Sequence, residues 1–117
     1  MLQILQTENI SRYSEYCGEQ SGDIHAVEAV DKDEILGFCV YHFDEDSVYI
    51  DFIDCNEAEL FDGLIRSVLY IANGKNYKNA VFNIDDEKSI NMMKQLNYPQ
   101  NKIFLIEQWF LMLKKCK

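Results

Sequence analysis

Long apolar runs are absent from this 117-residue sequence. No stretch approaches the roughly 18 to 20 apolar residues that a helix needs to cross a bilayer. Residues 1–13 also lack the basic segment followed by an apolar run that marks a secretory signal. The sequence therefore predicts a cytoplasmic protein without a membrane partner.

Basic residues are scarce: 11 Lys and Arg stand against 20 Asp and Glu, which gives a formal net charge of −9. This charge repels phosphate backbones and anionic lipid surfaces. We therefore expect neither nucleic acid nor a membrane surface as a partner. Most of the acidic side chains are expected to form a solvated surface that keeps a small protein soluble.

Spacings typical of metal, redox or covalent chemistry are also missing. No two cysteines form a C-x-x-C pair, and no G-x-S-x-G or Cys-His signature is present. His25 and His42 lack a spaced partner and are interpreted as structural or surface side chains. No metal is expected, and the cysteines are expected to be reduced and unpaired: Cys17, Cys39, Cys55 and Cys116.

The chain does have enough apolar residues, 48%, for one compact core, so residues 1–117 are expected to form a single domain. In the first half, residues 1–6 predict a strand and residues 8–17 a short helix. Residues 24–30, 34–43 and 47–53 predict three antiparallel strands separated by acidic turns. The middle strand is apolar on both faces, so its sheet should be covered on both sides.

In the second half, residues 57–73 predict a helix that ends at Asn73-Gly74. Its apolar stripe is Leu60, Phe61, Leu64, Ile65, Val68, Leu69 and Ala72. A strand over residues 80–84 precedes a second helix, which Asp85 or Asp86 can cap. Residues 103–113 predict a long final strand.

This order of elements resembles the GNAT acetyltransferase family, from about Glu34 onward. The stretch 85–98 carries the most specific part: Asp86, Ser89-Ile90, Met92-Met93 and Asn97-Tyr98 fit the frame in which the family often has Asn, Ala-Ile, Leu-Tyr and Gly-Phe. The resemblance implies an α/β (α+β) fold with a mixed, mostly antiparallel sheet flanked by helices on both faces. It also implies acetyl-CoA as the cofactor and a small amine or protein amine as the acceptor.

The resemblance places the cofactor loop before the long helix. Asn56 stands at the family's Arg or Gln, and Glu59 and Phe61 at its two glycines. Bulky side chains there would occupy the space in which backbone amides approach a diphosphate, and Glu57, Glu59 and Asp62 would repel it. Binding of acetyl-CoA is therefore expected to be weak or absent. The implied cofactor-binding residues are Asn56, Glu59, Leu60, Phe61, Asp62 and Asp86.

Candidate catalytic residues follow from the same resemblance. Met93 replaces the Tyr that often protonates the departing thiolate, and a thioether has no proton to give. Tyr98 is a substitute acid only if it turns inward, and otherwise an aromatic that closes the core. Asp51 and Glu28 are the candidate bases, although each can instead face solvent at a sheet margin.

Two functions remain open from the sequence. One is an N-acetyltransferase-like protein that transfers an acyl group from acetyl-CoA to an unidentified amine. The other is a catalytically inactive GNAT-fold module that binds a partner or senses a ligand, for which a homodimer through the aromatic segment 103–113 is one possible arrangement.

Overall fold

The computed structural model describes residues 2–7, 24–84, 86–96, 98 and 103–107. The helix expected over residues 8–17 lies outside these ranges, as do Cys17 and Cys116. The described elements, in chain order, are β1 (Leu2–Thr7), β2 (Ile24–Asp31), β3 (Glu34–Asp44), β4 (Ser47–Cys55), α1 (Ala58–Gly74), β5 (Asn79–Phe82), α2 (Glu87–Gln95) and β6 (Ile103–Leu105).

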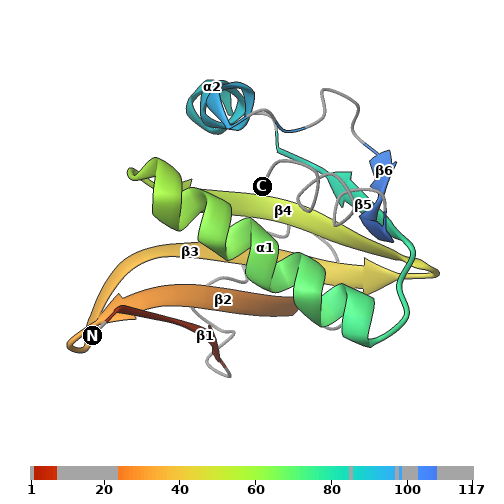
Figure 1. Cartoon of the computed structure of the whole chain (residues 1–117), viewed down its shortest axis with the longest axis horizontal. Coiled ribbons are helices and arrows are strands. Elements are labelled where there is room, and N and C mark those ends of the chain that lie inside the picture. The colour runs from red at the N-terminus through yellow and green to blue at the C-terminus, as the bar shows by residue number, and fades with distance from the viewer. Residues whose placement is uncertain (1, 8–23, 85, 97, 99–102, 108–117) are drawn as a thin grey trace.

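The strands form one six-stranded sheet in the order β1-β2-β3-β4-β5-β6. All neighbours are antiparallel except β4 and β5, which are parallel. The parallel pair needs a crossover connection, which α1 provides, and Figure 1 shows this helix lying across β2, β3 and β4. The mixed, mostly antiparallel sheet and the parallel pairing of residues 79–82 with β4 confirm the predicted fold class.

The apolar stripe of α1 forms the centre of the core. Its buried residues are the seven predicted ones, Leu60, Phe61, Leu64, Ile65, Val68, Leu69 and Ala72. They pack on inward-facing side chains of the strands, such as Tyr41, Ile50 and Ile53. Burial of this stripe is the main apolar contribution that holds the helix on the sheet.

Helix α1 ends at Gly74, as the predicted stop at Asn73-Gly74 requires, but the left-handed residue that follows it is Asn76. Asn76, with a φ of 67°, takes the left-handed conformation. The Asn76 and Tyr77 N–H groups donate to the Asn73 and Ala72 carbonyls, 3.1 and 3.0 Å away. This pattern satisfies the last carbonyls of the helix, and Asn tolerates the left-handed region better than most residues.

Both faces of β3 are buried, as its sequence predicts. Cys39 and Tyr41 join the core under α1, whereas Val40 packs with Ala26 in a second cluster on the opposite face. Cys39 and Cys55 are free, buried thiols. Their lack of pairing agrees with the prediction for these two residues.

The second helix begins as expected, because the Asp86 side chain accepts a hydrogen bond from the Ser89 N–H at 3.0 Å. Met93 is buried, while Ile90 and Leu96 on the same side are partly buried. The Asp86 carboxylate is therefore the N-cap of α2.

The prediction of one continuous strand over residues 103–113 is wrong at Ile106 and Glu107, and its residues 108–113 lie outside the described ranges. β6 ends at Leu105, and Ile106 and Glu107 are helical. Leu105 pairs with Asn79, the first residue of β5, so β5 offers no further antiparallel partner. No helix in the described ranges is both long enough and apolar enough to span a membrane.

Candidate functional site

The parallel strands β4 and β5 separate halfway along β4. Pairing runs from Ser47 opposite Asn79 to Ile50 opposite Phe82. The Asn83 N–H then donates to the Ile50 carbonyl at 2.8 Å. β4 continues to Cys55, while the chain after β5 leaves toward α2 (Figure 1). We call this point of separation, between Ile50 and Asn83, the fork.

A β-bulge lies at the fork. The register of β3 and β4 pairs Val40 with Phe52 and Tyr41 with Ile50, and so skips Asp51. Such an extra residue bends a strand and redirects its side chain. The bulge therefore places the Asp51 carboxylate beside His42 of β3.

His42 and Asp51 form a buried pair. Nδ1 of His42 lies 2.6 Å from Oδ2 of Asp51, and each side chain is 9% exposed. The imidazole stacks on Tyr49 with ring centroids 4.8 Å apart and planes 7° from parallel. The other carboxylate oxygen, Oδ1, accepts a hydrogen bond from Asn83 Nδ2 at 3.2 Å. A histidine that donates Nδ1–H to a carboxylate keeps a lone pair on Nε2, so this pair can take up a proton.

Asn56 and the first turn of α1 lie at the far end of β4. Glu57 is the N-cap residue, and its side chain makes no capping hydrogen bond. The first helical N–H groups, those of Ala58, Glu59 and Leu60, have no acceptor within the helix. Lys88 Nζ of α2 donates to Oδ1 of Asn56 and so brings an ammonium group beside this turn.

Phe61 does not obstruct the start of α1, which corrects the expectation of a bulky side chain there. Leu60 and Phe61 are only 6% and 1% exposed and point into the core. The Phe61 N–H is already bonded to the Glu57 carbonyl at 2.9 Å. Of the two residues at the glycine places, only Glu59 has an exposed side chain.

Tyr98 closes the core. It is 5% exposed and meets Phe82 edge to face, with centroids 6.1 Å apart. Its hydroxyl donates to Asp62, whose other oxygen lies 2.5 Å from Arg66 Nε. Burial, and then the Asp62 carboxylate, raise the pKa of Tyr98 well above its usual value. The hydrogen bond between Tyr98 and Asp62 therefore has a structural role, and the Tyr98 hydroxyl is not positioned as a general acid.

The helix α2 is bonded to β4 beyond the fork. Ser89, 3% exposed, donates its hydroxyl to the Ile53 carbonyl at 3.3 Å. Together with the bond from Lys88 to Asn56, this contact draws α2 against the second half of β4.

Glu28, the other candidate base, lies apart from the fork. It is 8% exposed on β2 opposite Phe38, so β3 separates it from Asp51. His25 lies against the rings of Tyr41 and Phe43. In the described ranges, no group of three or more His, Cys, Asp or Glu is arranged to hold a metal ion.

Three residues of the site were not predicted: His42 as a partner of Asp51, and Asn83 and Lys88. The hairpin turn after Asp44 places His42 opposite Tyr49, two residues from Asp51, so the pair is visible only once the strand register is known. The positions of Asn83 and Lys88 in the site depend on the separation of β4 from β5. No local sequence pattern predicts this separation.

No protein-family model and no curated protein matches the sequence significantly. Solved structures do match. The ribosomal-protein-S18-alanine N-acetyltransferase from Escherichia coli superposes with a TM-score of 0.64 at 10% identity, over 86% of this chain and 79% of that one. A GNAT-family acetyltransferase from Staphylococcus aureus Mu50 gives a TM-score of 0.60 at 8% identity, over 90% and 98%. At such low identity the likeness concerns the fold, and the chain is a GNAT-fold protein.

Proposed function

We propose that the chain is an N-acetyltransferase that moves an acetyl group from acetyl-CoA to an amine at the fork. The observation that carries this proposal is the buried pair of His42 and Asp51 at the bulge, held by Asn83 where β4 leaves β5. The two structural neighbours, both acetyltransferases by description, support the same reaction class.

The start of α1 fits the diphosphate of acetyl-CoA. N–H groups at a helix N-terminus and a nearby ammonium group are typical anion ligands. Here these are the N–H groups of Ala58, Glu59 and Leu60, together with Lys88 Nζ, which already reaches Asn56. The carboxylates of Glu57 and Glu59 repel the diphosphate and so weaken its binding. Because Ser89 also bonds α2 to β4, we expect weak binding.

Bound acetyl-CoA would supply the acetyl group as a reactive thioester. The chain supplies the base: Asp51 orients the His42 ring through Nδ1, and Nε2 then takes the proton of the attacking amine. Asn83 fixes the second oxygen of Asp51 and so limits rotation of the carboxylate. Met93 has no proton to donate, and the hydroxyl proton of Tyr98 is bonded to Asp62. Neither residue protonates the departing thiolate, which would leave as the anion and take a proton from water.

The acceptor is a small amine or a protein amine. A net charge of −9 favours the approach of cationic amines over anionic substrates. The alternative function, an inactive interaction or sensing module, leaves the buried acid–base pair and its Asn83 contact without a role, so it is less well supported.

A thiol-release assay tests this function. The protein is incubated with acetyl-CoA and a panel of amines that includes polyamines, lysine derivatives and peptides with free N-termini. We expect amine-dependent release of CoA and an acetylated product by mass spectrometry. Absence of product with every amine, although acetyl-CoA binds, would contradict catalysis and favour the inactive module.

A further inference from the structure

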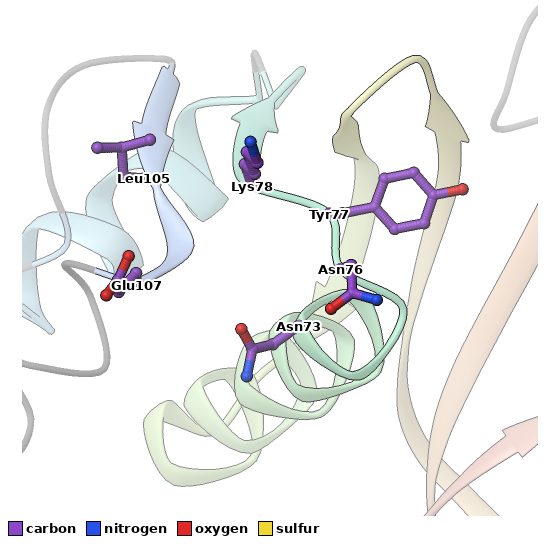
Figure 2. A pocket seen from close by; sticks show the side chains of 6 residues that line it. All are labelled: Asn73, Asn76, Tyr77, Lys78, Leu105 and Glu107. Atoms are coloured by element: carbon purple, nitrogen blue, oxygen red, sulfur yellow. The ribbon is translucent and has the colours of Figure 1, made fainter.

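A hollow lies at the C-terminal end of α1. It has a volume of about 530 Å³ and is lined by Asn73, Asn76, Tyr77, Lys78, Leu105 and Glu107. Figure 2 shows these side chains around the end of α1, the connection to β5 and the end of β6. The 17-residue helix, about 25 Å long at 1.5 Å per residue, separates this hollow from the proposed diphosphate turn at the start of α1, and the hollow shares no lining residue with the fork. It is therefore distinct from the proposed acetyltransferase site.

Among its described lining residues, the hollow carries one charge of each sign. Lys78 and Glu107 are both exposed. Within the described ranges, neither side chain forms an ion pair or a hydrogen bond. Both charges are therefore available to a ligand, and a ligand that bears only one charge would leave the other unmatched.

The end of α1 favours a cation near Glu107. The helix has no basic residue in its last turn. The following Lys75 does not compensate its negative end fully, because its Nζ lies over the Phe43 ring, 5.2 Å from the centroid. A helix C-terminus attracts positive charge. The end of α1 and Glu107 together therefore form a subsite for the positively charged group of a ligand. Lys78 provides the subsite for its negatively charged group.

Apolar and amide surfaces complete the lining. Leu105 is 44% exposed, although it is a large apolar side chain. The amides of Asn73 and Asn76 both donate and accept hydrogen bonds, and thus suit either charged group of a ligand. The volume lies in the usual range for small-molecule sites, about 300 to 1,000 Å³.

We propose that this hollow binds a free α-amino acid with an apolar side chain. The ammonium group faces Glu107 and the end of α1, the carboxylate faces Lys78, and the side chain lies on Leu105. Nucleotides and other polyanions are excluded by Glu107 and by the negative end of the helix. The site is independent of the acetyltransferase proposal, since it shares no residue with the fork.

An NMR titration of the intact chain with L-leucine tests the site. We expect saturable shifts of the backbone amides of residues 76–78 and 105–107, with a Kd on the order of 1 mM. N-acetyl-leucine lacks the ammonium group and leucinamide lacks the carboxylate, so each should bind about tenfold more weakly, as expected from the loss of one charge-assisted contact. Failure of leucine to give saturable shifts at these residues up to about 10 mM would overturn the proposal.

Charge-neutralising variants test whether Lys78 and Glu107 bind the two charged groups of leucine. Lys78→Gln and Glu107→Gln are surface changes that should keep the fold and weaken leucine binding about tenfold each. Lys94→Gln and Glu87→Gln, at exposed positions of α2, are the matched controls and should leave the affinity unchanged. Equal leucine affinity in all four variants would show that the charges of the hollow do not recognise a zwitterion.

Discussion

His42 and Asp51 lie on neighbouring strands with Nδ1 and Oδ2 2.6 Å apart, at the bulge where β4 separates from β5. Both side chains are largely buried, so the pair is held in one geometry and shielded from water. A base that must be oriented before an amine arrives needs this combination.

Asp51→Asn should lower kcat/KM for acetyl transfer by about 10²- to 10⁴-fold, because the amide no longer stabilises the protonated His42 ring. Asp54→Asn is the matched control, since Asp54 lies on the same strand but is exposed. The assay is amine-dependent CoA release, with circular dichroism to confirm the fold. Equal loss of activity in both variants would contradict a specific role for Asp51.

His42→Gln should impair the same step as Asp51→Asn. Because the two residues act as a unit, the double variant should be little slower than the slower single variant. Steady-state kinetics of the four proteins give this coupling directly. If the two effects simply multiply, His42 and Asp51 act separately and the proposed base is incorrect.

Glu59→Gln should tighten acetyl-CoA binding about threefold to fivefold, because a like charge near the diphosphate costs about 1 kcal/mol in water. Lys88→Gln should weaken binding by a similar factor, and both effects should shrink as salt is raised. Isothermal titration calorimetry measures these affinities. Glu87→Gln on α2 is the control, and a change there as large as that of Glu59→Gln would show that only net charge matters.

Phe61→Ala should lower the free energy of unfolding by about 3 to 5 kcal/mol, because it removes a fully buried ring from the centre of the core. Tyr70→Ala, on the exposed side of the same helix at 65% exposure, should change it by about 0.5 kcal/mol or less. Urea unfolding measures both. Phe61 therefore cannot be exchanged for the glycine that the family loop has at this place without loss of a central core side chain.

Stability should fall as the pH rises above about 9. Burial raises the pKa values of Cys39, Tyr41 and Tyr98 above their ordinary values of 9.0 for the thiol and 10.0 for the hydroxyls. Above these values the unfolded chain releases protons that the folded chain retains, so the free energy of unfolding decreases with pH. Urea unfolding between about pH 8 and 11 measures the slope. Cys39→Ala should reduce it, and an unchanged slope would mean that Cys39 does not contribute.

Much of the fold follows from local pattern. The α1 stripe, the β2–β4 strands and the Asp86 cap depend on periodicity and capping within a few residues, which the sequence displays directly. The early end of β6 depends instead on the length of its partner β5. The pairing of Asp51 with His42 requires the bulge. Phe61 lies in the core because its position on the helix faces the sheet, although the family motif has a glycine at this place. The end of β6 and the pairing of Asp51 with His42 are set by tertiary register, whereas the burial of Phe61 follows from the local helical stripe.

The most direct test of the fork as the cofactor site is an NMR titration of the unaltered protein with acetyl-CoA. The account predicts saturable shifts at residues 51–60 and 83–89, weak affinity, and no comparable shifts at residues 73–78. Shifts confined to residues 73–78, or none at the fork when acetyl-CoA is in large excess, would contradict the assignment of the fork as an acetyltransferase site.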